Sequence, residues 1–307
     1  ESLYKYPLFS KMQDFVPGDS FLDCLLSQKP YPLKGALLMG GNPMITWPGG
    51  DLIKKALGSL ELMVAVDTVM TKTSELANYV LPAAAYWEKN MLHARQIMDD
   101  QGKQKHNLVL MRKILSSEER RSDWWILSEL GRRMGFESYY PWNDDLQSID
   151  ALLEPLNLTW QDIGPQGILL DGDQTVDQLD DFPTPSGKIE FWSHLAQSHG
   201  QQASLEYIPP VESQESTPEL AKEYPLVLTV GGCDIVFPHS QFRYLESLRK
   251  NHLELKAKLN PETARLYQIQ HGDFIVVETL RGKIRVKVAL TENIIPGVVS
   301  LKHGWQE

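Results

Sequence analysis

Two glycines, an asparagine and a proline, Gly40, Gly41, Asn42 and Pro43, directly follow a short apolar run over residues 34–39. Open α/β sheets bind ligands at the carboxyl ends of their strands, and glycines there let backbone amides come close to a diphosphate. An ordinary turn between a strand and a helix has the same composition. The four residues match neither a dinucleotide fingerprint nor a Walker loop, so phosphate binding and a plain turn both stay open.

Asp67 ends a second apolar run, over residues 62–66. At the end of a strand in a nucleotide-binding fold, a carboxylate reaches a ribose or the edge of a base. It accepts two parallel hydrogen bonds, which suits the N1–H and the exocyclic amine of guanine but not adenine, whose N1 is itself an acceptor. The alternative is that Asp67 only caps the segment that follows it, residues 68–73.

Both candidate sites require a parallel sheet to position them. Between the two apolar runs, residues 51–57 have the apolar spacing of a helix, so the order is strand, helix, strand. A third strand is predicted at residues 79–81, where Pro82 stops it. Further along, a helix is predicted at residues 123–133, with Ser122 as its N-cap. The first part of the chain is therefore expected to be an α/β domain.

Beyond residue 222 the pattern changes to strands separated by turn residues. The predicted strands cover residues 226–230, 274–280, 283–289 and 298–301. Arg281 and Gly282 are expected to form the tight hairpin turn between the second and the third of these. In the third strand Ile284, Val286 and Val288 alternate with charged residues, which predicts one buried face.

Asn260 and Pro261 begin a short helix in this β-rich region, because asparagine caps exposed amides and proline fits the first helical position. A short helix between the strands of a small β domain favours a closed barrel. The segment before it carries scattered proline, glycine and polar residues with few long apolar periods. We therefore expect an α/β region over residues 1–140, a connecting region with short elements over 141–222, and a β-barrel domain over 223–307.

Composition excludes several classes of function. The chain has 307 residues, a formal net charge of -10 and a pI near 5.3. Nucleic acid is not an expected partner, because contacts to phosphates need clustered Lys and Arg. No apolar run approaches the roughly 20 residues that cross a bilayer, so direct membrane insertion is not expected. Cys24 and Cys233 cannot supply a four-thiolate cluster by themselves.

Several short motifs follow one another along the chain, and their order is informative. The first region contains GGNP at 40–43, VAVDTVMTKT at 64–73, LANYVLP at 76–82 and WE at 87–88. The second contains GG at 231–232, HSQ at 239–241, NPETA at 260–264, HGD at 271–273, RG at 281–282 and IPG at 295–297. This order resembles the molybdopterin oxidoreductases of the dimethyl sulfoxide reductase type. Residues 184–192, TPSGKIEFW, resemble the thiosulfate and polysulfide reductase branch.

The resemblance implies two molybdopterin guanine dinucleotides that hold molybdenum or tungsten, anchored by α/β halves and covered by a barrel of the double-psi type. Carried over residue by residue, it places at the cofactor Gly40, Gly41, Asn42, Pro43, Asp67, Thr71, Gly232, His239, Ser240 and Gln241. It implies neither a catalytic residue nor a metal ligand in this sequence. Two positions depart from the family pattern: Asn78 stands where aspartate is common, and Cys233 where arginine is common.

The sequence lacks a Cys-x-x-Cys-x-x-x-Cys run, and it begins with Glu1. By resemblance, a 4Fe–4S cluster and the metal ligand belong to an N-terminal half that this sequence does not contain, and the chain is interpreted as a fragment. The implied partners are that half, an iron–sulfur electron-transfer subunit and a membrane anchor subunit. The compartment, on the periplasmic side or in the cytoplasm, stays open.

The resulting hypothesis is the cofactor-binding part of an oxidoreductase catalytic subunit that reduces a sulfur compound and is inactive as an isolated fragment. The alternative is a noncatalytic module that carries molybdopterin dinucleotide or mediates an interaction. A conventional nucleotide-dependent enzyme is the third hypothesis, and it lacks a matching fingerprint.

Overall fold

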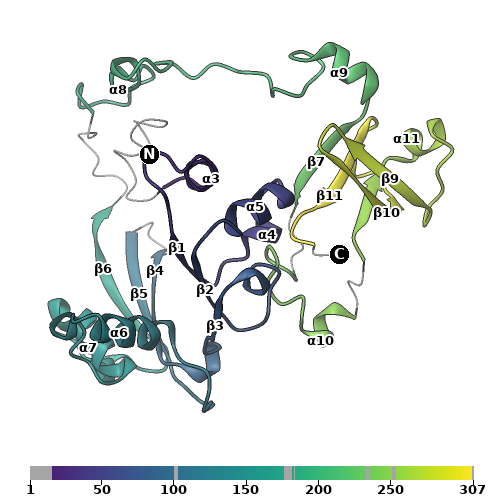
Figure 1. Ribbon diagram of the computed structural model, residues 1–307. Helices are drawn as coiled ribbons and strands as arrows, with labels where there is room; N and C mark the ends of the chain where they lie inside the picture. Colours follow the sequence, from purple (N-terminus) through teal and green to yellow (C-terminus); the bar gives the residue numbers. More distant parts are fainter. Residues whose placement is uncertain are drawn as a thin grey trace. The chain divides into compact units, whose positions relative to one another are not determined.

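The computed structural model of the protein describes residues 16–99, 103–175, 182, 184–232, 236–250 and 254–305. The chain divides into two compact units (Figure 1). The first unit contains Glu1–Gly41 and Lys55–Ser204, and the second contains Asn42–Lys54 and Leu205–Glu307. The division of the chain at residues 141 and 223 stays a prediction.

A parallel sheet of three strands forms part of the first unit. Its strands are β1 (Gly35–Met39), β2 (Leu62–Asp67) and β3 (Tyr79–Pro82), in the order β1-β2-β3. Leu37 of β1 lies opposite Val64, and Val64 lies opposite Tyr79 of β3. The predicted strand, helix, strand order is confirmed, since α5 (Gly50–Leu57) follows β1 and precedes β2. The third strand runs one residue further than predicted and includes Pro82.

The two faces of this sheet differ in burial. Met63 and Ala65 are 1% and 3% exposed, whereas Leu62 is 47% exposed and Tyr79 63%. Parallel sheets are normally covered on both faces, and their strands are therefore apolar throughout. Here one face of the sheet is buried and the other remains largely open among the described residues.

Helix α6 (Asp123–Arg133) begins as the sequence predicts. The hydroxyl of Ser122 accepts a hydrogen bond from the backbone amide of Trp125 at 3.2 Å, which satisfies one of the free amides of the first turn. Ile126 of this helix is buried together with Val66 and Ala83. The helix thus covers the sheet near the carboxyl end of β2.

An antiparallel sheet that the sequence did not predict completes the first unit. It consists of β4 (Met91–Met98), β5 (Lys103–Met111) and β6 (Ile168–Thr175), with β5 in the middle. Helix α7 (Asp145–Leu153) contributes Ile149 and Leu153 to a core shared with Leu108 of β5. The region expected to be connecting therefore supplies both a strand and a helix to this sheet.

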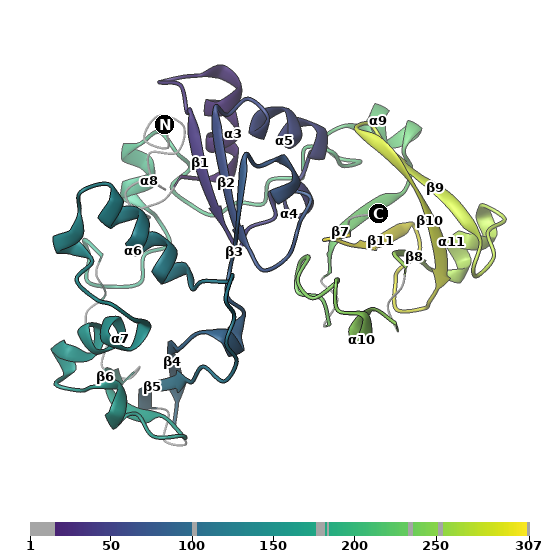
Figure 2. The same ribbon diagram turned by 60° about the horizontal axis from the view of Figure 1, so that its bottom comes forward.

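The remaining elements are short helices (Figure 2). The α-helices are α3 (Gly18–Ser27), α4 (Pro43–Thr46), α8 (His194–Ser198), α9 (Pro218–Glu223), α10 (Glu246–Arg249) and α11 (Pro261–Leu266). The 3-10 helices are η1 (Ser74–Leu76), η2 (Tyr86–Glu88), η3 (Glu137–Tyr139), η4 (Glu154–Leu156) and η5 (Trp160–Asp162). Cys24 of α3 is a buried free thiol, as expected, whereas Cys233 lies outside the described residues.

The second unit contains a curled sheet of five strands. They are β7 (Val227–Gly232), β8 (Lys256–Leu259), β9 (Phe274–Thr279), β10 (Gly282–Leu290) and β11 (Val298–Lys302), in the order β7-β11-β8-β10-β9. The sheet is mixed: β10 pairs with β8 in parallel and with β9 antiparallel. Between the described residues of its two outer strands no pairing is present, so closure into a barrel stays a prediction.

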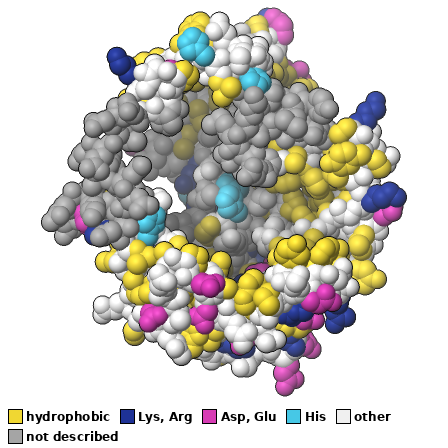
Figure 3. Space-filling view, turned by 90° about the vertical axis from the view of Figure 1, so that its left-hand side faces the viewer, with side chains coloured by type: hydrophobic (Ala, Val, Ile, Leu, Met, Phe, Trp, Pro, Cys, Tyr) yellow, Lys and Arg dark blue, Asp and Glu magenta, His cyan; other side chains and the backbone are white. Residues whose placement is uncertain are grey.

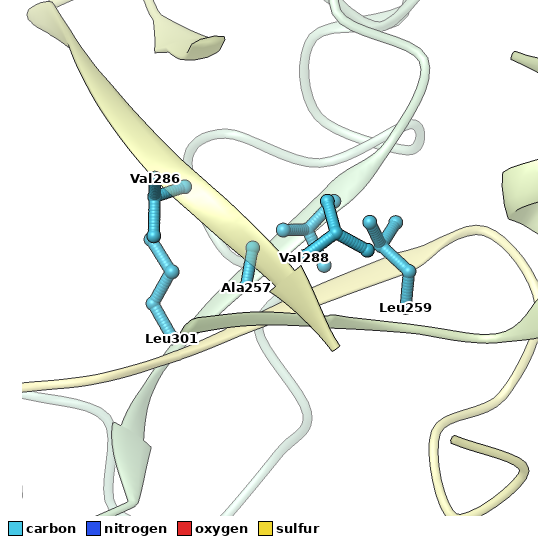
Figure 4. Close-up of a cluster of buried hydrophobic side chains, with 6 residues drawn as sticks. Ala257, Leu259, Val286, Val288 and Leu301 are labelled. Atoms are coloured by element: carbon cyan, nitrogen blue, oxygen red, sulfur yellow. The ribbon is translucent and has the colours of Figure 1, made fainter. Parts of the chain in front are cut away.

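The core of this sheet is made of small and branched side chains (Figure 4). It contains Ala257, Leu259, Val286, Val288, Val299 and Leu301, each no more than 5% exposed. They come from three neighbouring strands, β8, β10 and β11. Alternation along β10 puts Val286 and Val288 on the buried face as predicted, but Ile284 is 44% exposed, so the expectation for that residue was wrong.

Two local predictions in the second unit have different outcomes. Asn260 caps α11, because its side-chain oxygen accepts from the amide of Glu262 at 2.8 Å. The hairpin turn was predicted one residue too late. Gly282 already pairs with Thr279, so the two-residue turn consists of Leu280 and Arg281.

The surface carries large apolar side chains among charged ones, as the face in Figure 3 shows. Phe191 is 90% exposed and Tyr207 78%. Within the described part of the chain, no helix has the length and apolarity to cross a membrane.

Candidate functional site

In the first unit, the residues predicted to bind phosphate and guanine lie at the carboxyl edge of the parallel sheet. The backbone amide of Gly40 donates to the carbonyl of Val66 at 2.9 Å, which joins the loop after β1 to the end of β2. Gly40 has φ +60, a conformation that favours glycine. A Cβ atom at Gly40 or Gly41 would meet nothing within 4 Å. The backbone of this loop is therefore open to a ligand.

Asp67 stands next to that loop, at the end of β2. Its Oδ1 accepts a hydrogen bond from the amide of Thr68 at 2.7 Å. Partial burial raises the pKa of the Asp67 carboxyl above its usual value, while hydrogen bonds from Thr68 and Val69 act in the opposite direction. The capping role left open by the sequence is thus present. It does not exclude a ligand, because a carboxylate has about four acceptor positions.

Thr71 is buried, and its side chain is engaged with Ser74. The hydroxyl of Thr71 donates to the Ser74 hydroxyl at 3.1 Å and accepts from the Ser74 amide at 3.1 Å. A threonine oxygen has two lone pairs, so a single acceptor position is left for any ligand. Thr71 therefore shapes the turn after β2, and its contact with guanine stays a prediction.

Asn78, which departs from the family pattern, lies away from this edge. Its side-chain oxygen accepts from the amide of Met63 at 2.7 Å, near the start of β2. An aspartate would accept the same hydrogen bond, so the substitution leaves the carboxyl edge of the sheet unaffected.

In the second unit, Asn42 and Ser240 come together. The side-chain nitrogen of Asn42 donates to the hydroxyl of Ser240 at 3.3 Å, although the two residues are 198 positions apart. Asn42 is 8% exposed, and Pro43 is buried at the first position of α4. The carbonyl of Asn42 accepts from the amides of Ile45 and Thr46 at 3.0 Å. Hydrogen bonds through both the backbone carbonyl and the side-chain amide therefore fix the position of Asn42.

His239 pairs with a residue that the sequence did not single out. Its Nδ1 lies 2.9 Å from Nε2 of His303. Across this contact one ring nitrogen donates and the other accepts. His239 has φ 54, which is unusual for a residue other than glycine.

Gly232 and Gln241, also predicted to line the cofactor path, are exposed. Gly232 ends β7, and a Cβ atom there would meet nothing within 4 Å. The amide of Gln241 donates to the carbonyl of Pro238 at 3.0 Å, which forms a turn directly after Ser240. Cys233 follows Gly232 and is outside the described residues.

The polar groups present suit a guanine dinucleotide. Open glycine backbone supplies amides for phosphate, and a carboxylate at a strand end supplies acceptors for guanine. In the second unit, taken by itself, the indole nitrogen of Trp305 is a buried donor for which the described residues offer no acceptor. In the described parts of the chain, no group of three or more His, Cys, Asp or Glu could hold a metal ion.

A groove of about 780 Å³ also occurs in the first unit, on the open face of the parallel sheet. Leu37, Leu62 and Val64 line one side, and Trp125 and Leu130 of α6 line the other. None of the residues predicted to bind the cofactor lines it. It lies between a partly exposed face of the sheet and α6, and it is not the site predicted at the carboxyl edge.

Two family models match the chain over most of its length. The model of the molybdopterin oxidoreductases matches residues 10–133, and that of the molydopterin dinucleotide binding domain matches residues 226–307. The chain belongs to the molybdopterin oxidoreductase family. The two matched ranges contain every residue predicted to contact the cofactor, and the resemblance to the dimethyl sulfoxide reductase type is confirmed.

The chain is similar in sequence to relatives that are named for different reactions. The acetylene hydratase of Syntrophotalea acetylenica is 27% identical over 99% of this chain and 41% of its own length. The thiosulfate reductase molybdopterin-containing subunit of Salmonella typhimurium is 27% identical over 93% of this chain and 40% of its own length. Among solved structures, the acetylene hydratase from Pelobacter acetylenicus superposes with a TM-score of 0.82 at 26% identity, over 94% of this chain and 39% of that one.

The chain thus spans only about 40% of the length of these relatives. The mixed α/β fold is confirmed by the structural similarity, with one parallel and one curled sheet.

Proposed function

We propose that the chain is the cofactor-binding part of an oxidoreductase catalytic subunit that carries molybdenum or tungsten between two molybdopterin guanine dinucleotides. The observation that carries the proposal is the placement of Gly40, Gly41 and Asp67 at one edge of a parallel sheet, within a range that matches the molybdopterin oxidoreductase model. When bound, the metal of the cofactor supplies the redox chemistry.

The residues of this chain would bind and orient the cofactor. Amides of the Gly40–Gly41 loop would donate to phosphate, and the Asp67 carboxylate would accept from guanine N1–H and its amine. In the second unit, Asn42 and Ser240 form a hydrogen-bonded pair whose remaining polar positions would face phosphate or pterin. Holding the cofactor rigidly from several segments is what allows an enzyme to use its reactivity.

We extend the proposal to the reduction of a sulfur compound and to a curled sheet that closes as a double-psi barrel. The thiosulfate reductase subunit is 27% identical to this chain, and residues 184–192 resemble the same branch. The acetylene hydratase is also 27% identical to this chain, so sequence identity alone does not distinguish reduction of a sulfur compound from hydration of acetylene. The two relatives define a pair of assays: thiosulfate or polysulfide reduction with an artificial electron donor, and acetylene hydration.

Partners and further cofactors belong to the same proposal. One relative is named as a molybdopterin-containing subunit, which favours an assembly with other subunits. We infer an iron–sulfur electron-transfer subunit and a membrane anchor subunit, with a 4Fe–4S cluster and the metal ligand on polypeptide outside this sequence. The 307-residue chain by itself is then inactive. The alternative, a noncatalytic module that carries the dinucleotide, predicts that no longer polypeptide exists.

The decisive experiment is to purify the full-length protein, release its small molecules in acid, and quantify guanine nucleotide, molybdenum and tungsten. Two guanine nucleotides for each metal ion support the proposal. A protein that contains metal but no guanine nucleotide, or neither, contradicts it. Detection of guanine nucleotide on a protein of only these 307 residues, without a metal, would favour the carrier module.

A further inference from the structure

Two segments of the second unit approach each other closely around His239. Nδ1 of His239 lies 2.9 Å from Nε2 of His303, and the two ring centroids are 5.0 Å apart. Gly304 follows His303 with φ +81, and a Cβ atom there would overlap the carbonyl group of His239. The segment 303–305 therefore lies directly on the backbone of the loop that carries His239 and Ser240.

Arg243 lies between two aromatic rings at this junction. Its guanidinium carbon is 5.0 Å from the centroid of the Phe237 ring and 4.1 Å from that of Trp305. Phe237 is 1% exposed, so this ring is a fixed support. A guanidinium is planar and delocalised and stacks well on aromatic faces, which a lysine ammonium cannot reproduce. The two rings belong to the two segments that meet.

The same guanidinium also reaches the backbone of both segments. One of its terminal nitrogens lies 3.4 Å from the carbonyl oxygen of His239 and 3.4 Å from that of His303. These distances are at the long end of the normal range, so each hydrogen bond is weak by itself. Together with the stacking, they make Arg243 a bridge that contacts each segment through a ring and a carbonyl.

The loop over residues 237–243 has an unusual backbone conformation. His239 has φ 54 and Phe242 has φ 62, so two residues other than glycine adopt left-handed conformations within four positions. Such conformations are costly and persist only where the surroundings determine them. Arg243 contacts this loop through the Phe237 ring and the His239 carbonyl, so it is among the surroundings that hold these angles.

We propose that Arg243 is a positioning residue, which clamps the loop 237–243 to the segment 303–305 and so fixes His239 and Ser240 for the cofactor. This inference rests on the proposed function, because it takes His239 and Ser240 as part of the cofactor site. Arg243 acts through these residues and through the backbone.

The test uses the full-length protein with Arg243→Gln and Arg243→Lys. Arg285→Gln is the matched control, because Arg285 also stacks on a ring of the second unit, Phe274 at 4.6 Å. Amide hydrogen exchange is measured segment by segment, and bound guanine nucleotide is quantified after acid release. For both Arg243 variants we expect exchange about tenfold faster in 237–243 and 303–305, with unchanged exchange in the core strands β8 and β10.

Bound guanine nucleotide should fall about fivefold in both Arg243 variants and stay constant in the control, since a site held too loosely loses its ligand. Addition of ethylguanidinium to Arg243→Ala should slow exchange in both segments again, whereas ethylammonium should not. A purely structural loss of stability would not show this selectivity.

Several results would overturn the inference. Wild-type exchange in both segments of Arg243→Gln would show that the residue clamps nothing, and wild-type behaviour of Arg243→Lys would show that only charge matters. Faster exchange with unchanged nucleotide content would refute the link to the cofactor and leave the proposed function intact. If the wild-type protein holds no guanine nucleotide, the proposed function fails, and the exchange data still decide whether the clamp exists.

Discussion

The side-chain nitrogen of Asn42 donates a hydrogen bond to the hydroxyl of Ser240 at 3.3 Å, and both residues belong to the second unit although they lie 198 positions apart. The donor is nearly buried, at 8% exposure. A buried hydrogen bond that loses one partner leaves the other polar group unsatisfied.

We expect Asn42→Ala and Ser240→Ala each to lower the free energy of unfolding of the second unit by about 1–2 kcal/mol. Chemical denaturation of the two single variants and the double variant gives the coupling between them, which should be about 0.5–1.5 kcal/mol. Gln241→Ala, at an exposed neighbouring position, is the control and should change little. Strictly additive effects of the two substitutions would show that the hydrogen bond does not contribute.

Asp67→Asn should weaken the binding of guanine nucleotide. Asparagine has one acceptor and one donor group, so one of its two contacts to guanine becomes a clash of donors, and the loss in binding should be about 2–4 kcal/mol. The measurement is the affinity for GDP and the guanine nucleotide content of the full-length protein. Asp51→Asn, an exposed change, is the control. An unchanged affinity would leave Asp67 as a turn cap only.

Asp67→Asn should also change how the free energy of unfolding depends on pH. Burial raises the pKa of Asp67, so the folded state binds its proton more tightly than the unfolded state does. The favourable contribution of this group is therefore present at low pH and is lost as the pH rises through the raised pKa. Relative to the wild type, Asp67→Asn should become more stable across that rise, as urea unfolding at a series of pH values would show. A difference that does not change with pH would contradict the shift.

Two glycines of the second unit should respond in opposite ways to alanine. At Gly304, φ is +81 and a Cβ would overlap the backbone of His239, so Gly304→Ala should cost about 2–4 kcal/mol of stability. At Gly232 a Cβ meets nothing, so Gly232→Ala should change stability by no more than about 0.5 kcal/mol. If Gly232 lies against the cofactor, its variant should still lose bound nucleotide. Equal stability losses for the two variants would contradict this picture.

Val288→Ala tests the core of the curled sheet. Val288 is 1% exposed between neighbouring strands, and its truncation should cost about 2–3 kcal/mol because a cavity remains. Val276 on β9 is 59% exposed, and Val276→Ala should cost well under about 1 kcal/mol. Thermal unfolding of both variants makes the comparison. A large loss for Val276→Ala would indicate that β9 is covered in the folded protein.

The elements predicted correctly from the sequence are those with a local signal. Ser122 and Asn260 cap helices through hydrogen bonds to amides two or three residues away, so the residue types alone revealed them. The antiparallel sheet was missed because β4 has mixed polarity, and the partner of β5 on its other side, β6, lies far along the chain. No local pattern encodes such a pairing.

In the candidate site, too, some residues were predicted from the sequence and others were missed. Gly40 and Asp67 were predicted to share an edge of the sheet, and the hydrogen bond from Gly40 to Val66 shows that their strands end together. His303 was missed as the partner of His239 because 64 residues separate them. Its one sequence signal was the neighbouring Gly304, which marks a close approach of two backbones.

The order of strands in the curled sheet also bears on how the protein is made. β7 is the first strand of this sheet to be synthesised, and in the sheet it pairs with β11, the last, through Val227 opposite Val298. A ribosome that adds about 5–20 residues each second would expose β7 for several seconds before its partner emerges. During translation β7 therefore has an unpaired edge until residues 298–302 are made, and a stop codon shortly before β11 would leave that edge without the partner it has in the folded sheet.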